Sequence, residues 1–182
     1  MPFPASKLTI HPAEILRRKT EKIVDFDEDL RHMVEEMITI MHESDGVGLA
    51  APQAGHSVQV FVCNAREDGE EDMVFVNPEI KWASPERVEC EEGCLSVPGI
   101  YEPVTRPERV RVRAQDLDGK VFELDCDGLL AVCIQHEMDH LDGKLFVDYL
   151  SALKRQRLKK KLLKARKRDA ADEQSTSHSP TL

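Results

Sequence analysis

The segment His136-Glu137-Met138-Asp139-His140 constrains this chain more than any other, because it has the pattern H-E-x-x-H. Residues i and i+4 of an α-helix share one face, so the two imidazoles of a helical segment can bind one metal ion. Glu137 between them would lie close enough to act on a water molecule bound to that ion. The segment therefore predicts a helix that carries a catalytic metal site.

The alternative for this segment is a charged helical face that is exposed to solvent and binds no metal. Against it, Leu129, Val132 and Cys133 would lie on the same helical face as the motif. Such a face is apolar at one end and metal-binding at the other. We therefore expect a substrate pocket that leads to a reactive centre.

A catalytic metal site of this kind has three protein ligands, so the two histidines need a third. In one class of zinc peptidases the third ligand is a histidine further along the motif, but Phe146 occupies that position here. In another class it is a downstream glutamate, but residues 149–168 contain no acidic residue. The best upstream candidate is Cys94. Taken alone it would more often be a buried apolar residue, but beside this helix we predict a thiolate ligand and a fourth position open to water.

A further segment, Gly46-Val47-Gly48-Leu49-Ala50-Ala51-Pro52-Gln53, combines small residues with a side-chain amide. Glycine lets the backbone approach a ligand closely, and Gln53 offers an amide donor. The segment is not a dinucleotide fingerprint, because its spacing differs from G-x-G-x-x-G and no strand is predicted before it. Taken alone, the pattern favours a helix stop with a tight turn over a functional loop.

Hydrophobic periodicity predicts an α+β domain. One helix is expected from Asp27 to about Glu43, with Asp27 as its N-cap, and a second over residues 128–141, with Asp127 as its N-cap. The first helix would bury an apolar stripe made of Leu30, Met33, Val34, Met37, Ile38 and Met41. Short apolar runs predict strands, the last two as a hairpin, at residues 58–62, 73–76, 110–114 and 121–124.

Charge is distributed unevenly along the chain. Residues 1–150 contain 15 basic and 31 acidic residues, whereas residues 151–168 contain 10 basic residues and no acidic one. The asymmetry favours a polyanionic partner for the basic segment, although a solvated surface helix is the plainer interpretation. We predict a catalytic domain over residues 1–150, a basic helix over 151–168 and a disordered polar tail over 169–182.

Nothing in the sequence indicates export or a membrane span. No apolar run approaches the ~20 residues that cross a bilayer, and residues 1–7 lack the features of a secretory signal. The five cysteines are an odd number, which argues against a disulfide framework. We expect a cytoplasmic protein that does not bind membranes.

Taken together, three segments of this sequence resemble the peptide deformylases. That family has the patterns Gly-x-Gly-x-Ala-Ala-x-Gln, Glu-Gly-Cys-Leu-Ser and Gln-His-Glu-x-Asp-His in this order, and the chain has them at residues 46–53, 92–96 and 135–140. The resemblance covers residues 5–165 and is to the bacterial form with a long C-terminal helix. It implies an α+β fold in which antiparallel β-sheets pack around a central metal-bearing helix, with a basic helix at the C-terminal end.

The function that the resemblance implies is hydrolytic removal of the N-formyl group from the N-terminal formyl-methionine of newly synthesised polypeptides, with release of formate. Cys94, His136 and His140 would bind the metal. Glu137 would act as the general base toward a metal-bound water and then as the acid toward the leaving amine.

The resemblance also implies roles for residues around the metal. Gln53, through its side-chain amide, and Leu95, through its backbone N–H, would stabilise the oxyanion. Some bacterial members carry a basic residue shortly after the cysteine segment, whereas this chain has Tyr101 near that place. The methionine side chain of the substrate would be bound by Val47, Gly48, Cys90, Leu129, Val132 and Cys133.

The cofactor that the resemblance implies is Fe(II) in cells, with nickel, cobalt or zinc as substitutes in purified protein. The implied partners are N-formylmethionyl nascent peptides and, through the basic helix 151–168, the ribosome. We expect a monomer.

Two other functions compete with this hypothesis. A general zinc endopeptidase would need a downstream third ligand, which the sequence does not offer. A structural metal module would close all four metal positions with protein ligands, the fourth being Cys90 or Cys133, and would leave Glu137 and Gln53 without a role.

Overall fold

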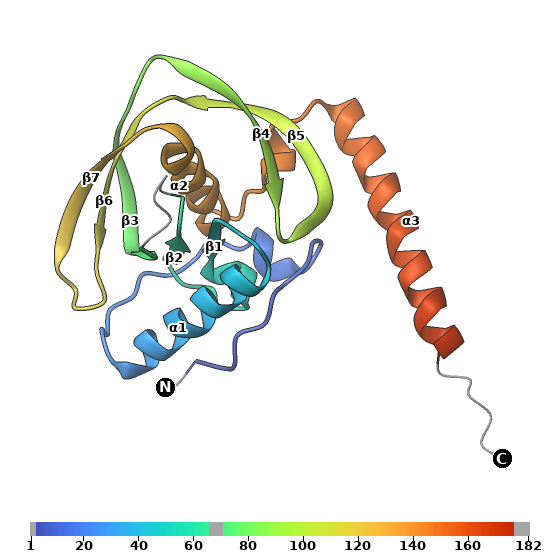
Figure 1. The fold of residues 1–182 in the computed structure, drawn as a ribbon, viewed down its shortest axis with the longest axis horizontal. Helices are drawn as coiled ribbons and strands as arrows, with labels where there is room; N and C mark the ends of the chain where they lie inside the picture. The colour runs from blue at the N-terminus through green and yellow to red at the C-terminus, as the bar shows by residue number, and fades with distance from the viewer. Residues whose placement is uncertain (1–2, 66–70, 177–182) are drawn as a thin grey trace. The chain divides into compact units, whose positions relative to one another are not determined.

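The computed structural model describes residues 3–65 and 71–176, and the chain divides into two units, Met1–Phe146 and Val147–Leu182. The first unit contains the two sheets and the first two helices, and the second consists mainly of one long helix (Figure 1). The expected α+β class with antiparallel sheets is confirmed. The boundary between the units falls after Phe146, a little before the predicted position at residue 150.

A five-stranded antiparallel sheet forms the larger layer of the first unit, with the strand order β1-β2-β3-β6-β7. The predicted hairpin at its edge is confirmed, with Val110 opposite Cys126 and Gln115 opposite Val121. The strands of this sheet are β1 (Gly48–Ala50), β2 (Val60–Cys63), β3 (Met73–Ala83), β6 (Val110–Gln115) and β7 (Val121–Cys126).

The two helices of this unit pack with different faces of strand β2. Val60 and Val62 belong to the core cluster of helix α1 (Glu28–Glu43), whereas Phe61 and Cys63 belong to that of helix α2 (Gly128–Leu141). Successive side chains of a strand point to opposite faces, so β2 is buried on both, and this is why its sequence is apolar without alternation. Figure 1 shows α2 in the middle of the unit, with strands around it.

Helix α1 begins where the sequence predicts. The Asp27 side chain accepts a hydrogen bond from the backbone N–H of Leu30 at 3.0 Å, as an N-cap does. The predicted stripe is buried except for Ile38, which is half-buried. Helix α2 also follows Asp127, but there the Asp127 side chain makes no capping bond.

A hairpin that the sequence analysis did not predict forms the second sheet. Strand β4 (Arg87–Cys94) pairs with β5 (Val97–Pro107), and the turn between them consists of Leu95 and Ser96. The pattern was missed because the polar–apolar alternation of β4 covers only residues 87–91, and because β5 contains three prolines, which argue against a strand. The hairpin brings Cys94 and Leu95 to the vicinity of α2.

Helix α3 (Ala152–Thr176) forms most of the second unit and runs beyond the predicted end at Arg168. Residues 169–176 were predicted to be disordered but continue the helix, since alanine, glutamate and glutamine there are good helix formers. Residues 177–182 of the predicted tail lie outside the described residues. The remaining short elements are the 3₁₀ turns η1 (Glu14–Arg17), η2 (Ala51–Ala54) and η3 (Phe146–Tyr149).

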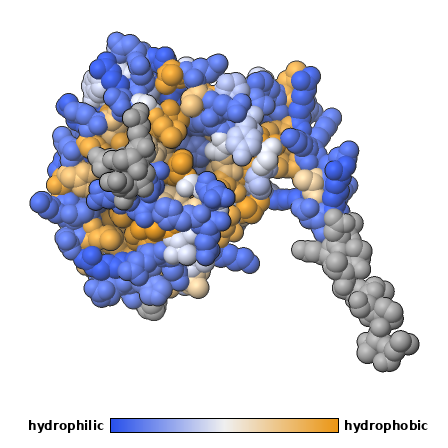
Figure 2. Space-filling model, in the orientation of Figure 1, coloured by the Kyte–Doolittle hydropathy of each residue, from blue (hydrophilic) through white to orange (hydrophobic). Residues whose placement is uncertain are grey.

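Hydrophilic residues cover most of the face seen in Figure 2, with hydrophobic residues showing between them. Over the described residues, no helix combines the length and the apolar character needed to cross a membrane. All five cysteines are free, as the odd count suggested.

Asn77 provides a test of how the N-terminal segment is attached to the sheet. Its backbone has a φ of +50°, and its side chain accepts from Ile23 N at 2.8 Å and donates to Ile23 O and to Oε1 of Gln115, both at 2.9 Å. Asn77→Ala removes these bonds and strains the left-handed backbone, so we expect it to lower the free energy of unfolding by about 2–4 kcal/mol in urea titrations.

Asn77→Gly is the matched control, because it removes the same bonds while glycine tolerates the positive φ. We expect it to lose less stability than Asn77→Ala. Equal stability of the parent and both variants would show that the side-chain bonds contribute nothing.

Candidate metal centre and cavity

The side chains of Cys94, His136 and His140 converge between helix α2 and the β4–β5 hairpin. One ligand atom from each lies within 4.8 Å of the others. The Sγ atom of Cys94 is 3.4 Å from Nε2 of His140, and the two imidazole ring centroids are 5.0 Å apart. The histidines lie one helical turn apart on α2, and Cys94 is the last residue of β4. The sequence prediction brought these three residues together correctly.

The chemistry of these three residues fits a transition-metal ion, for which one thiolate and two imidazoles are suitable donors. Burial holds the pKa of His140 well below its ordinary value, so its imidazole is neutral and can donate a lone pair. No other cluster of His, Cys, Asp and Glu with this spacing occurs in residues 3–65 and 71–176, and neither Cys90 nor Cys133 belongs to this one. The group therefore resembles an open site with three protein ligands rather than a closed structural site.

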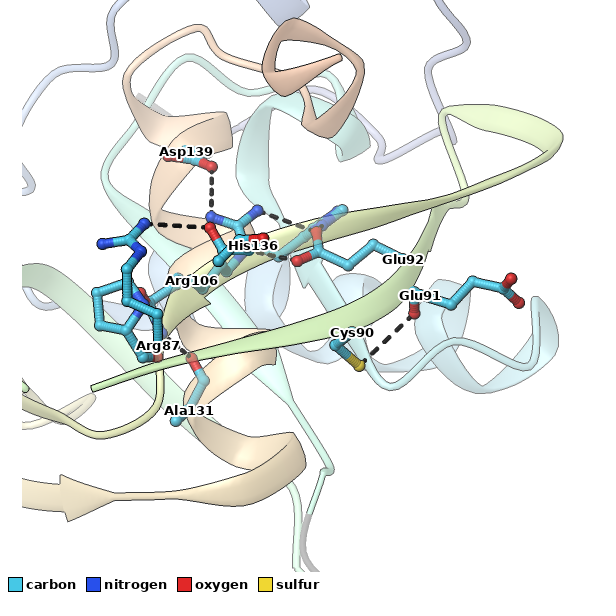
Figure 3. A network of polar contacts seen from close by, with 11 residues as sticks. Arg87, Cys90, Glu91, Glu92, Arg106, Ala131, His136 and Asp139 are labelled. Carbon is cyan, nitrogen blue, oxygen red and sulfur yellow. Dashed lines mark hydrogen bonds and ion pairs between the residues drawn. The ribbon is translucent and has the colours of Figure 1, made fainter. Parts of the chain in front are cut away.

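A buried ionic network holds His136 in position. Arg106 donates two hydrogen bonds to Glu92, at 2.5 Å from Nε and 2.9 Å from Nη2, and a third to Asp139 at 2.9 Å from Nη1. Glu92 in turn accepts from Nδ1 of His136 at 2.9 Å. Figure 3 shows Arg106 between Glu92 and Asp139, with His136 alongside. The bond to Glu92 leaves Nε2 of His136 available to a metal.

The charges in this network compensate one another inside the protein. Arg106 and Glu92 are only 4% and 5% exposed. Burial would raise the pKa of Glu92, but the hydrogen bonds of Arg106 and His136 lower it below the ordinary value. Burial would lower the pKa of Arg106, but Glu92 and Asp139 raise it further. Both groups are therefore ionised at neutral pH, and each depends on the other for that.

Glu137 lies between the two histidines and faces the cavity. Burial raises its pKa to about 7, partly offset by His136. Its Oε2 atom has no hydrogen-bond partner in the part of the chain that the structure describes. A Cβ atom at Gly48 would lie 2.5 Å from Oε1 of Glu137, so only glycine leaves room for this carboxyl group. A carboxyl group with a pKa near neutrality can both accept and donate a proton.

Gln53 is held at both ends of its side-chain amide. Its Oε1 atom accepts from the backbone N–H of Ala50 at 2.9 Å, and its Nε2 atom donates to Ser96 Oγ at 3.2 Å and to Cys94 Sγ at 3.4 Å. Gln53 is 1% exposed, so water cannot replace these bonds. The glycine-rich segment is thus more than a helix stop: it contains strand β1, and its last residue reaches the candidate ligand Cys94.

The turn residue Leu95 completes this side of the site. Its side chain lies close to Gly46, where a Cβ atom would be 2.7 Å from Leu95 Cδ1. The close approach of Leu95 explains why residue 46 is glycine, and the close approach of Glu137 explains why residue 48 is glycine.

A cavity of about 390 Å³ connects these groups. Gln53, Cys94, Leu95, His136 and Glu137 line it together with the whole set predicted to bind the substrate side chain, namely Val47, Gly48, Cys90, Leu129, Val132 and Cys133. Most of that set is apolar, and two of its members remain accessible, Val47 at 45% and Leu129 at 54% exposure. Tyr101, also in the lining, is 67% exposed.

Glu92, Arg106 and Asp139 were given no role from the sequence. Glu92 lies in the segment 92–96 and Asp139 in the segment 135–140. Their nearness in sequence to Cys94 and His136 could have indicated that they lie beside the site. Arg106 stands alone in a proline-flanked segment, Thr105-Arg106-Pro107, and only the pairing of β4 with β5 brings it opposite Val88 and close to Glu92.

Arg106→Met tests the buried network. The change keeps much of the side-chain volume but leaves the Glu92 carboxylate buried without a counter-charge, so we expect a loss of about 3–5 kcal/mol in the free energy of unfolding. Because Glu92 orients His136, we also expect Co(II) affinity to fall by about 10- to 100-fold. Urea unfolding and a spectroscopic Co(II) titration measure the two effects.

Arg111→Met is the matched control, because Arg111 pairs with Asp125 at 2.7 Å on an exposed strand surface. This variant should lose no more than about 1 kcal/mol in the free energy of unfolding, and its Co(II) affinity should be unchanged. Equal effects of the two substitutions would contradict the role given to the network.

Comparison with known proteins points to one family. The family model described as Polypeptide deformylase matches residues 5–156. A peptide deformylase 1 of Pseudomonas syringae pv. tomato is 52% identical over 159 residues, which is 87% of this chain and 95% of that protein. A peptide deformylase of Saccharophagus degradans is 49% identical over 159 residues, with 87% and 92% covered.

Solved structures show the same fold. A peptide deformylase from Legionella pneumophila superimposes with a TM-score of 0.85 at 46% identity, covering 92% of this chain and 98% of that one. A peptide deformylase from Synechococcus elongatus in complex with actinonin gives a TM-score of 0.81 at 40% identity, covering 91% and 90%.

Proposed function

The chain belongs to the peptide deformylase family, which removes the N-formyl group from nascent polypeptides, and we propose which of its residues perform each part of that hydrolysis. The observation that carries the proposal is the position of Glu137, a buried carboxyl group with an unpartnered oxygen among the described residues. It lines one cavity with Cys94 and His136, two members of the Cys-His-His group. Enzymes of this family are metal-dependent, and the group formed by Cys94, His136 and His140 would hold the ion.

A bound metal would contribute Lewis acidity, which lowers the pKa of a water molecule toward neutrality and polarises the formyl carbonyl. We propose Fe(II) as the ion in cells, with nickel, cobalt or zinc as substitutes in purified protein. The mixed sulfur and imidazole donor set supports a transition metal over Mg²⁺ or Ca²⁺, which prefer oxygen ligands.

Glu137 moves the proton in this reaction. It takes a proton from the attacking water, whose oxygen forms a bond to the formyl carbon. It then delivers that proton to the nitrogen of the substrate as the C–N bond breaks, so that formate and a free N-terminal amine result. A pKa of about 7, raised by burial, suits both steps near neutral pH.

Gln53 and Leu95 stabilise the negative charge that builds on the formyl oxygen. The amide Nε2 of Gln53 and the backbone N–H of Leu95 flank Cys94 from two different loops, and both residues line the cavity. Loss of one such donor typically costs about 2.7–4 kcal/mol in transition-state stabilisation.

The apolar part of the cavity binds the methionine side chain of the substrate. Cys133 and Val132 lie on α2 with the metal ligands, and Leu129 lies at the accessible end of the same helix. Gly48, the first residue of β1, and Val47 before it also line the cavity, and Cys90 lies on β4. A formyl group is small, so a confined space beside Glu137 would exclude internal peptide bonds by size.

Glu137→Ala tests the proposed base. Formate release from formyl-Met-Ala-Ser by the Ni(II)-loaded protein should fall by about 10²–10⁴-fold in kcat, because alanine cannot transfer the proton. The control is Glu123→Ala, on the exposed surface of β7, which should keep the parental rate. If Glu137→Ala, fully metal-loaded, kept the parental rate, Glu137 could not be the base.

The basic helix α3 supports a second part of the proposal, which is contact with the ribosome. All ten basic residues between 151 and 168 are exposed, and no acidic residue lies among them. A helix of this charge binds nucleic-acid phosphates through counterion release. Because the substrate is a nascent chain, we also propose that the protein acts in the cytoplasm. We further propose that it is a monomer.

A charge-reversal variant tests the ribosome contact. Changing Lys159, Lys160 and Lys161 to glutamate should abolish co-sedimentation with ribosomes at low salt, while formate release from a short peptide stays unchanged. The matched control changes the same residues to arginine and should still co-sediment. Equal co-sedimentation of the glutamate variant and the parent would reject the contact.

A further inference from the structure

The segment of residues 6–11, called the N-terminal strap here, joins the two loops that carry the proposed oxyanion donors. Its backbone N–H groups donate to main-chain oxygens of both loops. Lys7 donates to Ala54 at 3.1 Å and Thr9 donates to Gln53 at 2.7 Å, both in the η2 loop. His11 donates to Ser96 at 2.8 Å, in the turn between β4 and β5 that also contains Leu95.

The beginning of the strap is fixed to the body of the protein. The backbone N–H of Ser6 donates to Oε2 of Glu36 on helix α1 at 2.8 Å. The hydroxyl of Ser6 is hydrogen-bonded to Nε2 of His56 at 2.8 Å. The ring of Phe3 packs edge-on against the same imidazole, with 5.5 Å between centroids. His56 is 3% exposed, so this anchor is shielded from water.

We propose that the N-terminal strap is a positioning element for catalysis, which holds Gln53 and Leu95 at the separation that the oxyanion requires. The two donors come from loops 42 positions apart in the sequence, Gln53 in η2 and Leu95 in the hairpin turn. A side-chain bond from Gln53 to Ser96 links these loops inside the protein, and the strap links them again through the main chain. Gln53 and Ser96 are 1% and 0% exposed, so their geometry is set by protein contacts rather than by water.

The strap would act through the loops and not on the substrate. None of its residues is in the cavity lining that the described part of the chain provides. A misplacement of about 1 Å in a group that stabilises the transition state can cost about 10²-fold in rate. A loosened strap should therefore lower kcat while leaving KM and metal content unchanged, whereas a general loss of folding would lower stability and metal content together.

Thr9→Pro is the direct test, because proline removes the N–H that donates to the Gln53 carbonyl. Thr9→Ala is the matched control, since it removes the side chain and keeps the N–H. In the metal-loaded full-length protein, Thr9→Pro should lower kcat for formyl-Met-Ala-Ser about tenfold, with KM, metal stoichiometry and melting temperature close to those of Thr9→Ala. A rise in KM, or a parental kcat, would overturn the proposal.

A double-mutant cycle with Gln53→Ala separates positioning from a structural role. If the strap acts through the oxyanion donors, Thr9→Pro should cost much less in the Gln53→Ala background than in the parent. If Thr9→Pro lowered kcat by the same factor in both backgrounds, the strap proposal alone would be overturned. The proposal rests on the proposed function, so an inactive parent, or a Gln53→Ala variant as fast as the parent, would overturn both the oxyanion assignment and the strap.

Ser6→Ala is the alternative test of the strap if Thr9→Pro does not fold. It removes the hydroxyl bonded to His56 but leaves every strap N–H in place. We expect a smaller loss of kcat in the same direction, two- to fivefold, that also disappears in the Gln53→Ala background. The same loss in both backgrounds would count against positioning.

Discussion

The ionic contact between Arg106 and Glu92 is the interaction on which the rest of the site depends. Both side chains are buried, and each keeps the other charged. Glu92 lies on β4, two residues before Cys94, and it also holds His136 on α2. One carboxylate therefore connects the strand that carries Cys94 with the helix that carries both imidazoles. A metal site assembled from two separate elements needs such a connection, because neither element determines where the other lies.

Close packing around Glu137 is the second constraint. The carboxyl group is buried against Gly48 and Cys133, and its pKa rises as a result. Removing a carboxylate from water is costly, and here the cost falls on the group that we propose as the carrier of the proton. Strand β1, which contains Gly48, pairs with β2, so the position of this glycine is fixed by the same sheet that forms the core.

The helical half of the candidate metal centre could be predicted because its information is local. Two histidines and a glutamate on one helical turn determine their own geometry, and Asp27 marks a helix start in the same way. The apolar pocket followed, since Leu129, Val132 and Cys133 share that helix. The family resemblance supplied what spacing could not, namely the roles of Gln53 and Leu95.

The features that could not be predicted depend on pairing between distant segments. The β4–β5 hairpin alternates only over residues 87–91 and contains three prolines in its second strand, so its sequence is a weak signal for a strand pair. Arg106 matters only because β5 returns alongside β4 and turns it toward Glu92 and Asp139. The backbone bonds of the N-terminal segment leave no side-chain signature at all. In each case the contact is set by tertiary structure and cannot be predicted from local propensity.

X-ray absorption spectroscopy at the metal edge of the Fe(II)- or Co(II)-loaded protein tests the central claim most directly, because it counts the ligands of the ion. The account predicts one sulfur and two imidazole nitrogens, from Cys94, His136 and His140, with at least one further position filled by a light atom that exchanges with solvent. Two sulfur ligands and no exchangeable position would contradict it, since Cys90 or Cys133 would then close the site and Glu137 would have no water to act on.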